Sequence, residues 1–348
     1  MGNNQRIAVI GAGSWGTALA LVLANNGNQV DLYTRREDQK KEINERRTNE
    51  KYLPEIQLPI GIKASTNLEE VVRDKQFILL VVPSHSMRET CQKIEPFINE
   101  NSVLIHATKG LEINTYSRMS EVIKEEIEKI PIENIVVLSG PSHAEEVSKN
   151  MPTTVVVAGK KLAVAEQVQD LFMNTSFRVY TNSDLVGVEI AGALKNIIAL
   201  GAGLNDGLDF GDNAKAALMT RGLAEIARLG IELGANPLTF SGLAGVGDLI
   251  VTCTSKHSRN WRAGYMLGKG EPLESVLHKM GMVVEGVKTT KAAHYLAEKH
   301  HVRMPITSEL FHVLFEEKKP NDAVGDLMGR VKTHEMEEVS LTQMFDNN

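Results

Sequence analysis

One lysine inside an otherwise apolar helical pattern is the first candidate for proton-transfer chemistry. Apolar side chains recur at helical spacing between Asp184 and Gly211, and Lys195 lies in the middle of this stretch. Alanine and glycine residues lie one turn away from it, so a small molecule has room to lie against the helix. Desolvation lowers the pKa of an ammonium group, which lets a buried lysine donate a proton near neutral pH. The alternative is a lysine that extends its charged end from a buried helix into water.

A glycine-rich turn near the start of the chain indicates a dinucleotide site. Residues 6–10 form an apolar run of strand type, and the GAGSWG that follows puts Gly11, Gly13 and Gly16 in a G-x-G-x-x-G pattern. A helical run ending at Gly27 and a second strand, QVDLYTRR, complete the context that this fingerprint requires. The glycines allow a tight turn and a close approach of the pyrophosphate, and the helix N-terminus offers free N–H groups to the phosphates. An ordinary strand-to-helix turn is the alternative.

The end of that second strand indicates which dinucleotide binds. NAD sites usually carry an acidic residue there, which binds the ribose 2′-hydroxyl. This chain has Arg35 and Arg36 instead, and arginine matches the geometry of a phosphate group. We therefore expect NADP(H) as the preferred cofactor, with NAD(H) as the alternative. Glu37 and Asp38 follow directly and offer the two arginines other partners.

The rest of the first half alternates strand-like and helical runs, which predicts a doubly wound parallel sheet. The expected strands cover residues 76–82, 102–107, 134–140 and 153–159, and the expected helices cover 67–74, 115–129 and the region around 142–148. Beyond residue 181, helical periodicity dominates. We therefore expect an α/β fold, with an N-terminal Rossmann-type domain at residues 1–182 followed by an all-helical domain at residues 183–348.

Loops in this fold are candidates for substrate contacts. Ligands of doubly wound sheets bind beyond the carboxyl ends of the strands. Lys109 lies there, and it can reach a cofactor phosphate, a substrate oxygen or only solvent. His85 and His143 lie on similar loops, but single histidines are more often structural. In the second half, residues 252–262 are dense in hydroxyl groups and cations, which suits a phosphate monoester at a helix N-terminus or, alternatively, a polar surface loop.

Six long motifs follow one another along nearly the whole chain. They are GAGSWGTALA near the start, TKG at 108–110, SGPSHAEEV at 139–147, GALKNIIALGAGLNDGL at 192–208, GVGDLIVTCTSKHSRNWRAG at 245–264 and VVEGVKT at 283–289. Together they make the chain resemble the bacterial-type NAD(P)-dependent glycerol-3-phosphate dehydrogenases. The resemblance implies a Rossmann domain followed by a helical domain. It also implies reversible reduction of dihydroxyacetone phosphate to sn-glycerol 3-phosphate, which feeds glycerophospholipid synthesis.

The same resemblance gives roles to individual residues. Lys195 looks like the general acid and base. The implied substrate-binding residues are Lys109, Gly140, Ser142, Lys195, Asp248, Ser258, Arg259 and Asn260. The implied cofactor-binding residues are Gly11, Gly13, Ser14, Trp15, Gly16, Arg35, Arg36, Lys109, Ala144, Arg259, Val283 and Glu285. An ammonium group stabilises the alkoxide that forms when a ketone accepts a hydride, and it supplies the proton, so we expect no metal.

Composition limits the partners and the compartment. The formal charge of −6 argues against nucleic acid or an anionic membrane surface. We see no secretory signal pattern and no apolar run of the ~20 residues that span a bilayer, and the two cysteines lie far apart. We therefore expect a cytoplasmic protein without membrane insertion, and the family resemblance suggests a homodimer.

Two other functions fit parts of the pattern. A related two-domain reductase could act on a hydroxy acid, because arginine binds carboxylate as well as phosphate. A nucleotide-sensing module without turnover is the other alternative. Such a module does not need Lys109, Lys195 and Asp248 as proton-transfer groups in a cleft.

Overall fold

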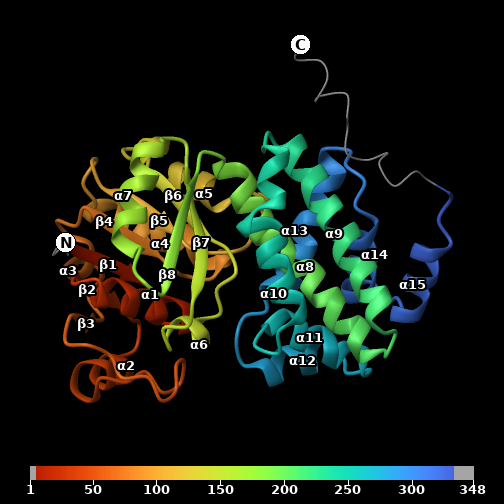
Figure 1. Cartoon of the computed structure of the whole chain (residues 1–348), viewed down its shortest axis with the longest axis horizontal. Helices are drawn as coiled ribbons and strands as arrows, with labels where there is room; N and C mark the ends of the chain where they lie inside the picture. Colours follow the sequence, from red (N-terminus) through yellow and green to blue (C-terminus); the bar gives the residue numbers. More distant parts are fainter. Residues whose placement is uncertain (1–4, 333–348) are drawn as a thin grey trace, which may run out of the picture.

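An eight-stranded sheet forms the first half of the molecule (Figure 1). The computed structural model describes residues 5–332, so residues 1–4 and 333–348 of the two expected domains lie outside the described residues. The strands are β1 Arg6–Ile10, β2 Gln29–Tyr33, β3 Ile62–Ser65, β4 Phe77–Leu80, β5 Val103–His106, β6 Ile135–Ser139, β7 Thr153–Gly159 and β8 Phe177–Asn182. Across the sheet they follow the order β3, β2, β1, β4, β5, β6, β7, β8.

Helices cover both faces of this sheet. They are α1 Ser14–Asn25, α2 Glu37–Lys41, α3 Leu68–Val72, α4 Met87–Ile94, α5 Met119–Glu126, α6 Ala144–Val147 and α7 Leu162–Phe172. Side chains of α1, α6 and α7 share one hydrophobic core with the strands, and those of α3, α4 and α5 share a second. Because the central strands are buried on both faces, their sequences are almost continuously apolar, as the expected doubly wound sheet requires.

One pairing in the sheet differs from the expected all-parallel arrangement. β7 lies antiparallel to β6, whereas the other neighbouring strands pair in parallel. The 13 residues between β6 and β7 contain only the four-residue α6, which spans about 6 Å at 1.5 Å per residue. The five-residue β6 spans about 16 Å. The helix in this connection is therefore too short to return the chain to the end of the sheet at which β6 begins. As a result, β7 runs antiparallel to β6.

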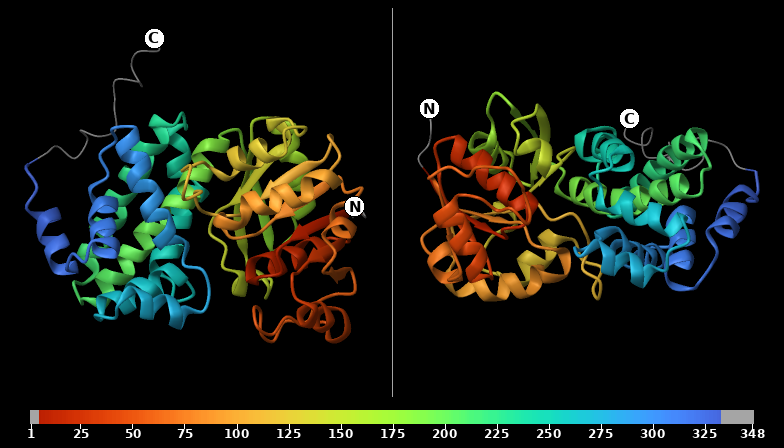
Figure 2. Two further views of the ribbon diagram at one scale, coloured as in Figure 1. Left: turned by 180° about the vertical axis from the view of Figure 1, so that it is seen from behind. Right: turned by 90° about the horizontal axis from the view of Figure 1, so that it is seen from below.

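The second half of the described chain is helical, which confirms the expected fold class (Figure 1). Its helices are α8 Leu185–Gly207, α9 Asp212–Glu232, α10 Asp248–Thr254, α11 Arg259–Gly268, α12 Leu273–Met280, α13 Glu285–Lys299, α14 Pro305–Phe315 and α15 Pro320–Met328. Short 3₁₀ and π-helical turns lie at Glu42–Arg46, Ser84–Ser86, Glu95–Phe97, Ile132–Asn134, Pro237–Ser241 and Leu243–Gly247. Figure 2 shows the two halves side by side from behind and from below. The boundary between residues 182 and 183 stays a prediction.

The long helix α8 is the central element of the helical half. It begins where the Asp184 side chain accepts a hydrogen bond of 2.8 Å from the Gly187 N–H, which caps the helix. Its length and composition would allow it to span a membrane, contrary to our expectation that no run in the sequence does so. In this molecule, 94% of its most apolar window is buried. Those apolar side chains belong to the core of the helical half.

Another difference from the expectation lies at α5. The sequence pattern predicts a helix over residues 115–129, but the helix begins at Met119 and ends at Glu126. Tyr116 adopts a left-handed conformation with φ of 63°, which a continuing α-helix does not allow. Its N–H donates to the carbonyl of Glu112 in a turn instead. Apolar periodicity therefore extends beyond the helix that it predicts.

Glycines set the distance between α8 and α11. Gly203 and Gly207 of α8 face Gly264 and Gly268 of α11, and a Cβ atom on any of them would collide with the backbone of the other helix. The carbonyl of Leu200, for example, occupies the position of a Cβ on Gly264. Close approach of the backbones brings the start of α11 beside the middle of α8. This packing positions the residues that the sequence analysis assigned to the substrate.

We predict that Gly264→Ala destabilises the protein by about 1–3 kcal/mol, because overpacking forces the two helices apart. Urea denaturation followed by circular dichroism measures the change in free energy of unfolding. Gly325→Ala is the matched control: Gly325 lies inside α15, and a Cβ there meets nothing within 4 Å. This control should stabilise the protein by about 1 kcal/mol, since alanine has the higher helix propensity. Equal stability of the Gly264 variant and the wild type would contradict the packing argument.

Candidate active site

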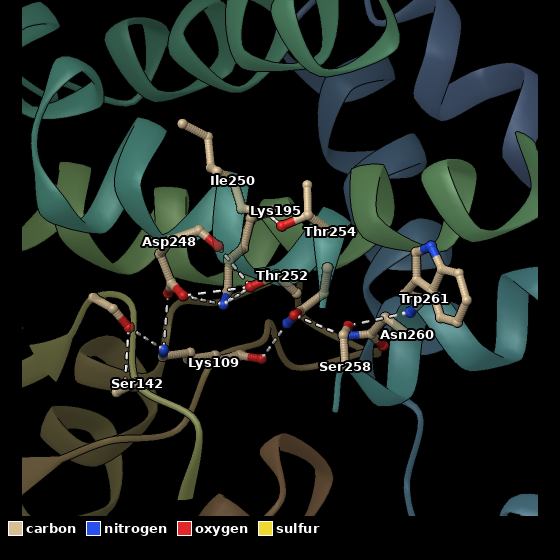
Figure 3. Close-up of polar contacts among 12 residues, drawn as sticks. Lys109, Ser142, Lys195, Asp248, Ile250, Thr252, Thr254, Ser258, Asn260 and Trp261 are labelled. Carbon is tan, nitrogen blue, oxygen red and sulfur yellow. Dashed lines mark hydrogen bonds and ion pairs between the residues drawn. The ribbon is translucent and has the colours of Figure 1, made fainter. Parts of the chain in front are cut away.

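Two lysines from different halves of the molecule meet at one carboxylate. Lys109, on the loop after β5, donates a hydrogen bond of 2.8 Å to Asp248 Oδ2. Lys195 of α8 donates 2.5 Å and 2.6 Å hydrogen bonds to Asp248 Oδ1 and Thr252 Oγ1. Figure 3 shows both lysine side chains converging on Asp248, at the start of α10. Only 1% of Asp248 and 5% of Lys195 is exposed, so these charges interact with little screening by water.

Burial and neighbouring charges set the protonation states of this cluster. Burial alone raises the pKa of the Asp248 carboxyl, but Lys109 and Lys195 outweigh it and hold that pKa below its usual value. Burial lowers the pKa of Lys195 to about 8; Asp248 opposes this effect and the charge of Lys109 adds to it. The alternative interpretation, in which Lys195 extends its charged end from the helix into water, is therefore wrong. Its ammonium can release and regain a proton close to neutral pH.

The loop after β6 helps to orient Lys109. Gly140 has φ of 124°, a conformation that favours glycine, and a Cβ there would lie 3.1 Å from the Cα of Val155. Its carbonyl accepts hydrogen bonds from Lys109 Nζ at 2.9 Å and from Ser142 Oγ at 2.8 Å. Three residues that the resemblance assigned to the substrate therefore meet in one place. Lys109 is fixed by a carbonyl and a carboxylate rather than extending into solvent.

A chain of side-chain amides connects this cluster to the start of α11. Asn196 donates to the carbonyl of Lys109 at 3.1 Å and accepts from Asn260 Nδ2 at 2.8 Å. Asn260 Oδ1 in turn accepts from the N–H of Gly286 at 2.9 Å. Asn196 was not predicted as a site residue, and Thr252 was expected only as part of the phosphate-binding segment 252–262 and not as a partner of Lys195. Spacing could have placed Thr252 beside Asp248, because it lies one helical turn further along α10. The signal for Asn196 was only a second polar side chain in the same apolar helix.

The expected phosphate-binding segment, residues 252–262, is divided between the end of α10 and the start of α11. Ser258 caps this helix, and its Oγ accepts a 3.2 Å hydrogen bond from the Trp261 N–H. Arg259, the first residue of α11, is exposed and donates to the carbonyl of Val283 at 3.2 Å. A helix N-terminus with a cation beside it offers a suitable site for a phosphate group. Thr252 and Thr254 instead lie in α10, where each donates its hydroxyl to a carbonyl one turn back.

The glycine turn after β1 has the geometry that a dinucleotide needs. Gly11 has φ of 119°, and a Cβ on Gly11 or Gly16 would collide with backbone carbonyls. A Cβ on Gly13 would meet nothing within 4 Å, so an approaching pyrophosphate finds open backbone there. Ser14 begins α1 and donates to the carbonyl of Tyr52 at 2.8 Å. Beside it, the buried Trp15 Nε1 finds no acceptor among the described residues. The turn therefore fits the expected cofactor.

The two arginines at the end of β2 differ in their surroundings. Arg36 forms an ion pair of 3.2 Å with Asp38, one of the alternative partners that the sequence offered. Glu37 pairs with Lys40 at 3.3 Å instead. Arg35 is exposed and forms no ion pair within residues 5–332. Arg35 is therefore the better candidate for a cofactor 2′-phosphate.

The far side of the expected cofactor cleft connects the two halves of the molecule. Glu285, the first residue of α13, accepts hydrogen bonds of 3.1 Å from the Ser84 N–H and 2.8 Å from Ser84 Oγ. Val283 precedes it and binds Arg259 through its carbonyl. Ala144 begins α6 directly after the loop of Gly140. Within residues 5–332, no group of three or more His, Cys, Asp or Glu side chains has the arrangement of a metal site.

Comparisons with known proteins show which family the chain is similar to. Two family models match: the N-terminus of NAD-dependent glycerol-3-phosphate dehydrogenase at residues 6–165, and its C-terminus at residues 184–325. Glycerol-3-phosphate dehydrogenase (NAD(P)+) of Halalkalibacterium halodurans is 60% identical over 96% of both chains. That of Bacillus mycoides is 61% identical over 96% of this chain and 98% of its own. The crystal structure of the Coxiella burnetii glycerol-3-phosphate dehydrogenase is 40% identical, with a TM-score of 0.90 over 94% of this chain and 99% of that one.

We predict that Asp248→Asn destabilises the protein by about 3–5 kcal/mol at pH 7, because it leaves the buried ammonium of Lys195 and the partly buried ammonium of Lys109 without their counter-charge. The loss should shrink as the pH rises toward 10. The folded variant can then release a lysine proton that its unfolded chain still binds, and stability rises with pH wherever the unfolded state binds more protons. Urea denaturation at pH 7 and pH 9.5 measures both effects. Asp209→Asn removes a carboxylate from an exposed pair with Lys269 and should change little. A pH-independent loss would contradict the assigned electrostatics.

Proposed function

The chain belongs to the NAD-dependent glycerol-3-phosphate dehydrogenase family, and we propose that Lys195 is the proton-transfer group of its reaction. The activity is the reversible, NAD(P)H-dependent reduction of dihydroxyacetone phosphate to sn-glycerol 3-phosphate, which belongs to lipid metabolism. The observation that carries the proposal for Lys195 is the buried carboxylate of Asp248 between two lysine ammonium groups. The two ammonium groups of this cluster place positive charge where the ketone oxygen becomes negative as the ketone carbon accepts a hydride.

The proposed mechanism follows from the surroundings of the two lysines. A dinucleotide held at the glycine turn would supply the hydride that the ketone carbon accepts. Lys195 donates a proton to the developing alkoxide oxygen, which gives the secondary alcohol, and the same group accepts that proton in the reverse direction. Lys109 stabilises the oxygen and contacts both substrate and cofactor, while Asp248 fixes both ammonium groups. The lowered pKa of Lys195 makes proton release possible at moderate pH.

The substrate phosphate has its own proposed site. The N-terminus of α11, with Ser258, Arg259 and Asn260, would bind it, and Gly140 and Ser142 would complete the substrate pocket. The dinucleotide would occupy the glycine turn at Gly11, Gly13 and Gly16, with Ser14, Trp15, Arg35, Lys109, Ala144, Arg259, Val283 and Glu285 around it. Binding energy from the remote phosphate would orient the small ketone for hydride transfer.

We predict that Lys195→Met lowers kcat by roughly a thousandfold, because general acid catalysis contributes about 10²–10⁴-fold. NADPH oxidation at 340 nm with dihydroxyacetone phosphate measures the rate, and fluorescence titration checks that NADPH still binds. Lys75→Met is the matched control, because Lys75 is a buried lysine paired with Asp31 at 3.1 Å on the sheet.

In the wild type, kcat/KM for reduction should fall as the pH rises through about 8, and kcat/KM for oxidation should rise there. Undiminished turnover by the Lys195 variant would move the role to Lys109.

We also propose that NADPH is the preferred cofactor and that Arg35 selects it. Arg35→Ala should raise KM for NADPH roughly tenfold and leave KM for NADH nearly unchanged, because a charge-assisted contact to the 2′-phosphate is lost. Arg36→Ala is the control, since Asp38 already binds the Arg36 guanidinium. Steady-state kinetics with both cofactors measure the ratio. Equal effects of the two substitutions would refute the selective role of Arg35.

The assembly and the compartment are also proposals. We propose that the enzyme is a homodimer, which the family resemblance supports, and that it works in the cytoplasm. The widely separated cysteines support that compartment, because cytosolic proteins rarely form disulfides.

A further inference from the structure

A second buried ionic cluster joins the two halves outside the reaction site. Its centre is Glu189 of α8, which is 6% exposed. The carboxylate accepts hydrogen bonds from the Ser120 N–H at 2.7 Å, from Ser120 Oγ at 2.6 Å and from Arg118 Nη1 at 2.6 Å. Both donor residues lie at the start of α5, in the sheet half. The helix that carries Lys195 is therefore tied to the sheet half by a charged group that takes no part in the proposed mechanism.

The Glu189 carboxylate also contacts β5, the strand that precedes the loop of Lys109. His106 ends β5, is fully buried, and its Nε2 lies 3.1 Å from Glu189 Oε1. Burial raises the pKa of Glu189, but His106 and Arg118 outweigh this effect and lower that pKa to about 2. Glu121 also binds Arg118, at 2.6 Å. Glu189 is therefore a fixed negative charge across the working pH range.

The two clusters share the same two backbone elements. Along β5 and its loop, His106 precedes Lys109 by three residues, and along α8, Glu189 precedes Lys195 by six. Six helical residues rise about 9 Å and turn about 600°, so the two side chains point about 120° apart around the helix axis. A helix held on two different sides can neither shift nor rotate without breaking contacts on one of them.

We propose that Glu189 is a positioning residue that holds α8 against β5 and the start of α5 at the spacing and rotation at which Lys195 and Lys109 both reach Asp248. The inference rests on the proton-transfer role proposed for Lys195. Hydrogen bonds to a carboxylate are directional, and both oxygens of Glu189 have donors from the sheet half. An apolar contact of the same area would hold the halves together without fixing the rotation of the helix.

The test compares Glu189→Gln with the matched control Glu225→Gln in the full-length enzyme. Glu225 is 2% exposed and lies in the same helical half, where it accepts bonds from the N–H groups of Ile306 and Thr307 at the start of α14. We expect Glu189→Gln to lower kcat by roughly ten- to a hundredfold, because small displacements of a reacting group are costly, while KM for NADPH changes little. The alkaline limb of the kcat/KM profile should move to lower pH, because Lys195 loses contact with the charge of Asp248. Other charged or titratable neighbours of Lys195 are Lys109, Cys253 and His143.

The control should lose thermal stability without a change in kcat or in the pH profile. In a Lys195→Met background, Glu189→Gln should cost no further rate, because a residue that acts through Lys195 has nothing left to position. If Glu189→Gln does not fold, Ser120→Ala gives the milder variant, since it removes one donor and keeps the carboxylate. A Glu189→Gln enzyme with reduced melting temperature but wild-type kcat and pH profile would overturn the proposal. Failure of the Lys195 role itself appears separately, as undiminished turnover by Lys195→Met alone.

Discussion

The structure of the site depends on one buried carboxylate that must neutralise two ammonium groups. Burying a charge without a partner is strongly unfavourable, so Asp248, Lys109 and Lys195 stabilise one another only when all three are present together. Lys109 belongs to the sheet half, and the other two belong to helices of the second half. The relative arrangement of the two halves is therefore a requirement of the electrostatics. A site at this junction also lies where the strands end, the usual location for ligands of such sheets.

The packing of α8 follows from this requirement. Glycines let α11 approach α8 closely, which brings Asn260 within hydrogen-bonding distance of Asn196. Near the sheet, Gly192 fits against the Ser139 side chain, where a Cβ would lie 2.8 Å from Ser139 Oγ. Small residues on α8 therefore let other elements approach closely, while its few polar side chains bind across to them. The composition that would also suit a membrane span allows α8 to be buried almost throughout its length in this molecule.

Patterns within a single element could be predicted from the sequence, whereas turns, the direction of a strand and contacts between distant residues could not. The glycine turn at Gly11 and the lysine within α8 were recognisable because both are patterns within a single element. The antiparallel β7 depends on a loop that is too short for a crossover, and the left-handed Tyr116 depends on a turn that apolar spacing does not reveal. The partners of Asp248 and of Glu189 lie about 50 to 140 residues away in sequence, and composition gives no register for such pairs. Helical spacing alone could have placed Thr252 beside Asp248.

The two charged residues of α8 show how the same burial produces opposite behaviour. Burial is the largest influence on the pKa of both Glu189 and Lys195. At Glu189 the neighbouring groups are donors and cations, so they outweigh burial and fix the charge with a pKa of about 2. At Lys195 an anion and a cation act in opposite directions, so burial prevails and the pKa falls to about 8. A fixed charge suits a residue that must hold the helix, and an adjustable charge suits a residue that must transfer a proton. One helix can carry both because the neighbours, rather than the depth of burial, decide which kind of charge results.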